Sequence, residues 1–150
     1  MFQLILGVMN KVLKRIFLFG VFFISLLISE CKKDKEGVPD VYVDVYLYTT
    51  DTAFYPLNAT SGYTYVAGGS KGILIFRKSQ TEFMAYDRHC TYKVPEGDIV
   101  TVDVSGLLGV DSKCSSKFLI TDGSVNQGPA INSLKRYQTS FDGTVLHIYN

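Results

Sequence analysis

From position 41 onward, this 150-residue chain consists of short runs of β-branched and aromatic residues, each closed by a turn signal. The runs alternate with a period of two, and no segment of about ten residues after position 40 has helical periodicity. Closely spaced short strands of this kind predict an all-β fold, an antiparallel β-sandwich or small barrel. The predicted strands are 41–48, 63–67, 72–77, 82–86, 99–104, 118–120, 137–141 and 145–149.

Two turns and one strand carry specific predictions. The glycine-rich run 68–72 is predicted to be a hairpin turn, and Asp142-Gly143 predicts a type I′ turn before the last strand. The run 41–48 is apolar on both faces, which predicts burial against the sheet on one side and under a loop on the other. The ten tyrosines of the chain leave two interpretations open: a binding face for a protein or glycan partner, or ordinary strand residues with hydroxyls at the rim. They include Tyr42, Tyr46, Tyr48, Tyr55, Tyr63 and Tyr65.

The first 30 residues have the three parts of an export signal. Lys11, Lys14 and Arg15 precede an apolar run over residues 16–28, and small Ser29 follows it. A helix over that run would span only about 20 Å, short of a hydrocarbon core of roughly 30 Å, so a permanent transmembrane helix is the weaker interpretation. Residues 1–30 are therefore predicted to be a signal peptide, with translation starting at Met1 or Met9.

Cys31 directly follows this signal and precedes the charged run 32–36. The arrangement resembles a bacterial lipoprotein signal, in which the cysteine becomes the lipidated N-terminus. This implies an exported protein anchored to a membrane of the bacterial cell envelope through Cys31, with residues 31–40 as a flexible tether. An ordinary signal peptide with an incidental cysteine remains the alternative.

Charge excludes one class of partner. Three of the 15 basic residues and Glu30 of the 14 acidic ones lie in the first 30 residues, which leaves 12 basic against 13 acidic residues. Binding to phosphates depends on clustered lysine and arginine, so no nucleic-acid partner is expected.

Two loops carry a resemblance to a known family. Phe118, the turn 121–123, the Gly-Pro-Ala run 128–130 and Leu134 match the frame of the second cluster-binding loop in Rieske iron–sulfur domains. The segment 87–92 similarly resembles the first such loop. The resemblance covers about residues 60–150, and it implies that residues 41–150 form a Rieske-like antiparallel β domain with an inserted cluster-binding subdomain.

The two loops resemble those of the Rieske family, but different residue types stand at the four iron-ligand positions. By this resemblance, Cys90 and Cys114 stand at a cysteine and a histidine position, while Tyr92 and Asp111 stand at the other histidine and cysteine positions. The chain in this respect resembles exported lipoproteins of the Bacteroidetes type that keep the Rieske frame without a full ligand set. A Rieske [2Fe–2S] cluster needs two thiolates and two imidazoles, and no histidine remains in this set.

The sequence therefore predicts a degenerate site with no cofactor and no metal. The alternative is an electron-transfer protein whose [2Fe–2S] cluster is held by Cys90, Tyr92, Asp111 and Cys114. The ring of His89, next to Cys90 in an extended loop, is expected to point away from the thiol, and His147 lies in the last predicted strand.

With Cys31 lipidated, one pair of cysteines is left. The resemblance implies that Cys90 and Cys114 lie on facing loops, where a disulfide would replace the iron as the link. Two free thiols are the alternative. No catalytic residues are assigned, because the sequence offers no Cys-x-x-Cys pair or converging catalytic triad. The predicted function is a non-enzymatic binding or structural module.

Overall fold

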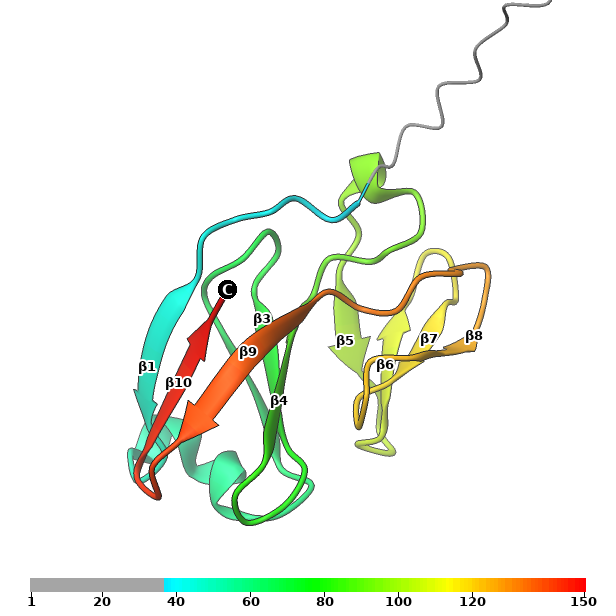
Figure 1. Cartoon of the computed structure of the whole chain (residues 1–150). Coiled ribbons are helices and arrows are strands. Elements are labelled where there is room, and N and C mark those ends of the chain that lie inside the picture. The colour runs from blue at the N-terminus through cyan, green and yellow to red at the C-terminus, as the bar shows by residue number, and fades with distance from the viewer. Residues whose placement is uncertain (1–36) are drawn as a thin grey trace, which may run out of the picture. The chain divides into compact units, whose positions relative to one another are not determined.

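The computed structural model describes residues 37–150, and the predictions for the signal peptide and for lipidation of Cys31 lie outside this range. The described part is almost entirely β, as predicted (Figure 1). Its ten strands are β1 (Asp44–Tyr48), β2 (Tyr63–Val66), β3 (Ile73–Arg77), β4 (Phe83–Asp87), β5 (Val100–Val102), β6 (Leu108–Asp111), β7 (Lys117–Leu119), β8 (Val125–Gln127), β9 (Arg136–Phe141) and β10 (Val145–Tyr149). No helix among these residues is long and apolar enough to cross a membrane.

The strands form two antiparallel sheets. The larger sheet has six strands in the order β1-β10-β9-β4-β3-β2, and the smaller has four in the order β5-β6-β7-β8. All strands of the smaller sheet lie between β4 and β9 in the sequence, so this sheet is an insertion into the larger one (Figure 1). The predicted β-sandwich with an inserted subdomain is confirmed.

Two strands and two short helices were not predicted. Strands β6 and β8 have only four and three residues, and Gly109 and Asn126 interrupt any apolar run within them. The 3-10 helices η1 (Thr52–Asn58) and η2 (Val94–Glu96) each contain a proline near turn residues. None of these elements is long enough to show a period of its own, so tertiary contacts decide their conformation.

The type I′ turn predicted at Asp142-Gly143 is wrong. A type I′ turn needs positive φ at both central residues, and Asp142 is not among the residues with positive φ, although Gly143 is (φ 103°). The loop has three residues between β9 and β10. The Asp142 carboxylate accepts hydrogen bonds from the amides of Thr144 (2.8 Å) and Val145 (2.7 Å), which stabilises this longer loop.

The expectation that both faces of the first strand are covered is also wrong. In β1 the side chains alternate, so that Leu47 is buried while Tyr46 and Tyr48 are 59% and 61% exposed. The ring of Tyr46 stacks on His147 of the neighbouring strand β10, with ring centroids 4.0 Å apart. The outer face of this edge of the sheet is therefore aromatic and open to solvent.

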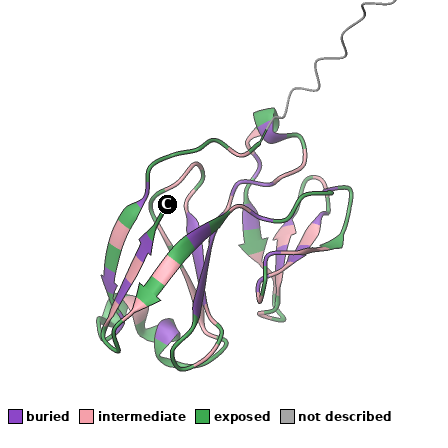
Figure 2. Ribbon diagram, viewed as in Figure 1, coloured by how far each residue is buried: buried purple, intermediate pink, exposed green. Residues whose placement is uncertain are grey.

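Strands β3 and β4 are buried on both faces (Figure 2). Alternate side chains point to opposite sides of the sheet, so these strands contribute to two separate cores. The first core packs inside the larger sheet and includes Ile73, Ile75, Phe83, Ala85, Leu146 and Ile148. The second core, which packs toward the inserted sheet, includes Leu74, Phe76, Met84, Tyr86, Cys90, Val100, Phe118 and Ile120.

Tyr86 in the second core gives a prediction about stability. Its hydroxyl is fully buried and has no hydrogen-bond partner among the described residues. Tyr86→Phe is expected to raise the free energy of unfolding by about 1 kcal/mol, because an unsatisfied buried hydroxyl costs about 1–3 kcal/mol. The matched variant is Tyr137→Phe, which removes a hydroxyl that donates to Asp87 (2.7 Å) and is expected to lower stability. Urea unfolding of both variants tests the pair, and the same sign for both would contradict this interpretation.

Candidate functional site: a group of two thiols and a carboxylate

The first loop of the site follows β4. Cys90 lies three residues after the end of that strand, and its amide donates to the Asp98 carbonyl (2.9 Å) across the loop. Helix η2 and the left-handed Gly97 (φ 66°) turn the chain back toward β5. The turn places the Cys90 side chain inside the second core, where it is fully buried.

The second loop connects β6 to β7. Asp111 ends β6, and its carboxylate oxygen Oδ1 accepts hydrogen bonds from the amides of Lys113 (2.8 Å) and Cys114 (3.3 Å). The Ser115 amide donates to the Asp111 carbonyl (2.9 Å), and Ser115 has positive φ (63°). These contacts form a tight loop that directs the Cys114 side chain toward the first loop.

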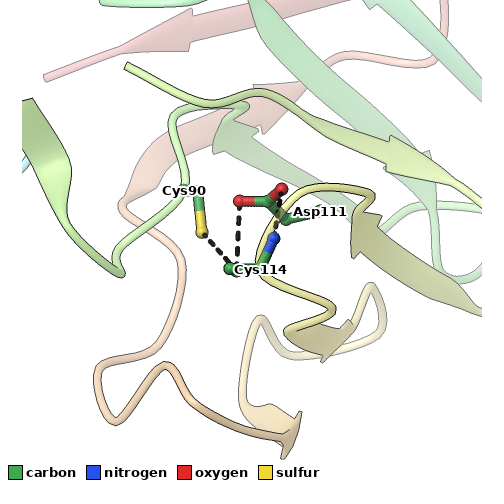
Figure 3. A group of neighbouring side chains, drawn as sticks. All are labelled: Cys90, Asp111 and Cys114. Atoms are coloured by element: carbon green, nitrogen blue, oxygen red, sulfur yellow. Dashed lines mark hydrogen bonds between the residues drawn. The ribbon is translucent and has the colours of Figure 1, made fainter. Parts of the chain in front are cut away.

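The two loops meet at three of the four predicted site residues (Figure 3). The sulfur atoms of Cys90 and Cys114 are 3.8 Å apart, and the Cys114 thiol donates to Asp111 Oδ2 (3.2 Å). One donor atom from each of the three residues lies within 4.8 Å of the other two. Both cysteines have the thiol form in this structure. The predicted proximity of these cysteines, on which a disulfide depends, is thus present.

A third loop, residues 128–134, closes the group. Ser116 Oγ lies 3.0 Å from Cys114 Sγ and accepts a hydrogen bond from the Ala130 amide (3.0 Å). The Thr91 hydroxyl donates to the Asn132 carbonyl (2.6 Å), which ties this loop to the first one. Ser116 is fully buried. The sequence analysis did not assign it to the site, although it stands at the serine of the Cys-x-x-His-Gly-Ser-x-Phe pattern that this loop resembles.

The surroundings favour a protonated Cys90 and an ionised Asp111. Burial, followed by the hydrogen bond to Asp111, raises the pKa of the Cys90 thiol far above its ordinary value. Burial alone would also raise the pKa of Asp111. Hydrogen bonds from the Cys90 thiol, the Lys113 amide and Cys114 outweigh it and hold that pKa below its ordinary value. A buried, protonated thiol is a poor nucleophile at neutral pH.

The fourth predicted residue, Tyr92, contributes differently. Its ring packs at the border of the second core, and the Lys93 ammonium lies 5.6 Å from the ring centroid. Tyr92 therefore supports the site by packing against the core that contains Cys90.

Neither histidine joins the group. His89 Nδ1 is 2.8 Å from Ser70 Oγ and its Nε2 is 2.8 Å from the Val94 carbonyl, so its ring points away from the thiol, as predicted. His147 Nε2 is 2.7 Å from Asp44 Oδ1 on the outer face of the larger sheet.

Asp87 holds the first loop in place through hydrogen bonds, and the sequence analysis did not predict this role. Its buried carboxylate accepts hydrogen bonds from four groups: the amides of Ser70 (2.6 Å), Lys71 (3.2 Å) and His89 (2.8 Å) and the hydroxyl of Tyr137 (2.7 Å). These donors come from the 68–72 turn, the first loop and β9. Asp87 thus holds together three segments that are distant in the sequence.

The donor set does not fit a Rieske [2Fe–2S] cluster. Such a cluster is held by two thiolates on one iron and two imidazoles on the other. Here the described residues bring together two thiols and one carboxylate, and both imidazoles are engaged elsewhere. A carboxylate is a harder ligand than imidazole and is a poor replacement for it on such a cluster.

Comparison with known proteins supports the fold class. No protein-family model and no curated protein matches the chain. Among solved structures, the plasma membrane Rieske protein of the cyanobacterium Synechocystis PCC 6803 is similar, with a TM-score of 0.55 and 20% identity over 71% of this chain and 99% of that one. The ferredoxin of carbazole 1,9a-dioxygenase from Nocardioides aromaticivorans IC177 has a TM-score of 0.49 and 13% identity over 73% of this chain and 98% of that one.

The described domain therefore has a Rieske-like fold. At these identities the likeness extends to the fold, and the site is judged from its own residues.

Proposed function

We propose that this chain is an exported lipoprotein of the bacterial cell envelope, anchored by lipid on Cys31, whose Rieske-like domain has lost its iron–sulfur cluster. In this proposal the domain is a non-enzymatic binding or structural module. The observation that carries it is the donor set: two thiols and a carboxylate meet where a Rieske cluster would need two imidazoles as well.

A covalent link between the loops is part of the proposal. Cys90 and Cys114 are 24 positions apart in the sequence, and their sulfurs already lie 3.8 Å apart. In an oxidising compartment such a pair forms a disulfide. Closing a loop of this length stabilises the folded state by about 3 kcal/mol on the chain-entropy model. The bond would then replace iron as the link between the two loops.

The buried thiol supports a non-enzymatic role. The raised pKa of Cys90 keeps its thiol protonated. The imidazole of the neighbouring His89 is in hydrogen-bond contact with the Ser70 hydroxyl and the Val94 carbonyl. A cysteine nucleophile is activated by a lowered pKa or by an imidazole base in contact with its sulfur. Cys90 has neither.

A surface for a protein or glycan partner is proposed on the outer face of β1 and β10. Tyr46, His147 and Tyr149 form a continuous stack there, with centroid distances of 4.0 and 4.6 Å, and Tyr48 is exposed beside it. Exposed, preorganised aromatic rings offer apolar area at a low cost in conformational entropy, which suits either type of partner.

The test is a measurement of iron, acid-labile sulfide and visible absorption on the full chain, purified anaerobically from membranes. We expect no iron and no colour, no reactive thiol in denaturant until reductant is added, and a loss of about 3 kcal/mol in unfolding free energy on reduction. When the Cys31→Ser variant is prepared in the same way, we expect it in the soluble fraction instead of the membrane fraction. About two irons per chain with sulfide would instead establish the alternative function, an electron-transfer protein with a non-standard ligand set.

A further inference from the structure

Cys90, Cys114 and Asp111 are arranged like the ligands of a single metal ion. In the thiol form the two sulfurs are 3.8 Å apart, and Asp111 Oδ2 is 3.2 Å from Cys114 Sγ. A tetrahedral ion with metal–sulfur bonds of 2.3 Å separates two sulfur ligands by about 3.8 Å, and a sulfur from an oxygen ligand by about 3.5 Å. Two of the three donor–donor distances therefore stand close to these spacings, and the third, between Cys90 and Asp111, is at most 4.8 Å.

The surrounding hydrogen bonds hold these donors in place. The Cys114 sulfur accepts a hydrogen bond from the backbone amide of Ser116, two residues further along the chain (3.4 Å). Amide donors of this kind stabilise thiolate ligands and orient them. Oxygen Oδ1 of Asp111 is occupied by the amides of Lys113 and Cys114. The other oxygen, Oδ2, faces the Cys114 sulfur and is free to bind an ion once that thiol loses its proton.

The group lies beside a surface cavity. This cavity, of about 240 Å³, has Asp111 in its wall, whereas Cys90 and Asp111 are buried and Cys114 is half-buried. An ion would enter from this side, and a water molecule would supply the fourth ligand. The cavity is lined by Gly97, Asp98, Ile99, Asp111, Ser112 and Lys113. Within this wall Asp98 is paired with Lys113, so its carboxylate is already neutralised by a partner.

We propose that, in the reduced chain, Cys90, Asp111 and Cys114 bind one thiophilic divalent cation of the zinc type. Two sulfurs and one carboxylate suit zinc-like ions, whereas magnesium and calcium require oxygen ligands throughout. The inference rests on the proposed absence of a cluster, because iron and sulfide would occupy the same space. A disulfide and the cation exclude each other, since the cation needs both sulfurs.

The test uses the full chain in detergent, reduced with a phosphine and stripped with a chelator under anaerobic conditions. Cobalt(II) alone is the probe. We expect one cobalt per chain with thiolate-to-cobalt charge-transfer absorption and the visible bands of a tetrahedral ion, and zinc should bleach both. Magnesium should not compete. Binding of cobalt without charge-transfer absorption would contradict the proposal that the two cysteines are ligands.

Variants separate this site from other possible donors. Cys114→Ser should abolish the charge-transfer absorption, and Asp111→Asn, which keeps both thiols, should weaken cobalt binding about tenfold or more. Cys31→Ser and His147→Gln are matched controls and should bind like the wild type. Circular dichroism verifies that each variant is folded. Unchanged absorption in folded Cys114→Ser, or its loss in His147→Gln, would contradict the assignment.

The outcomes for the two proposals are distinguishable. Iron and sulfide in the chain as isolated would overturn the cluster-free function and this site together. An iron-free chain whose reduced thiols give no cobalt absorption would overturn only the cation site and leave the proposed function standing. The oxidised chain should bind no cobalt, because its thiols are joined.

Discussion

Asp87→Ala is expected to lower the free energy of unfolding by about 4 kcal/mol or more, which places it among the largest effects of a single substitution. The carboxylate is fully buried and accepts four hydrogen bonds, two on each oxygen. These bonds use its whole acceptor capacity. Its removal leaves three amides and a hydroxyl without partners, and each orphaned buried donor costs about 1–3 kcal/mol. Thermal and urea unfolding measure the loss.

Two further variants make this result specific. Asp87→Asn keeps the shape but turns an NH₂ group toward two N–H donors, so an intermediate loss is expected. Asp40→Ala removes an exposed carboxylate that pairs with Lys135, and little change is expected because surface ion pairs contribute little. A loss for Asp87→Ala no larger than that for Asp40→Ala would contradict the structural role assigned to Asp87.

Phe118→Ala is expected to cost about 3–5 kcal/mol, as for other fully buried aromatic residues. Phe118 has no exposed surface and lies in the second core, opposite Gly109 in the register of β6 and β7. Val100 and Ile120 already pack closely over Gly109, so removal of the Phe118 ring leaves a cavity that its neighbours only partly close. Urea unfolding at a fixed redox state measures the effect.

The control for this prediction is Leu107→Ala. Leu107 is half exposed and lies just before β6, so its truncation is expected to change stability by less than about 0.5 kcal/mol. A loss under about 1 kcal/mol for Phe118→Ala would mean that the second core does not link the inserted sheet to β3 and β4.

The residues after the β6–β7 loop that resemble the Rieske frame are packing residues. Phe118, Ala130 and Leu134 are all buried in the second core, and Leu134 also donates its amide to the Gly123 carbonyl (2.9 Å). A Cβ on Gly123 would lie 2.6 Å from the Tyr86 ring, and its φ is 81°. These residues serve packing and backbone conformation. They can therefore keep the Rieske-like frame whatever occupies the ligand positions.

Local patterns predicted most of the strands. Eight of them have enough alternating β-branched and aromatic residues to be recognised, and glycine-rich turns such as 68–72 separate them. Strands β6 and β8 were not predicted from the sequence, because pairing with β7 imposes their extended conformation. The turn at Asp142 was predicted wrongly because the pair Asp-Gly also fits a longer hairpin loop, and here the Asp142 carboxylate stabilises that loop by accepting hydrogen bonds from Thr144 and Val145.

The sequence by itself determined the all-β class, because alternating residue types at short spacing predict strands. Tertiary structure alone decided which donors meet. Cys90 and Asp111 lie on different loops, and only the packing of the inserted sheet on β3 and β4 brings them within 4.8 Å. The four donors of Asp87 likewise come from segments up to 50 positions away. Burial and long-range pairing depend on the whole chain at once, so no local pattern encodes them.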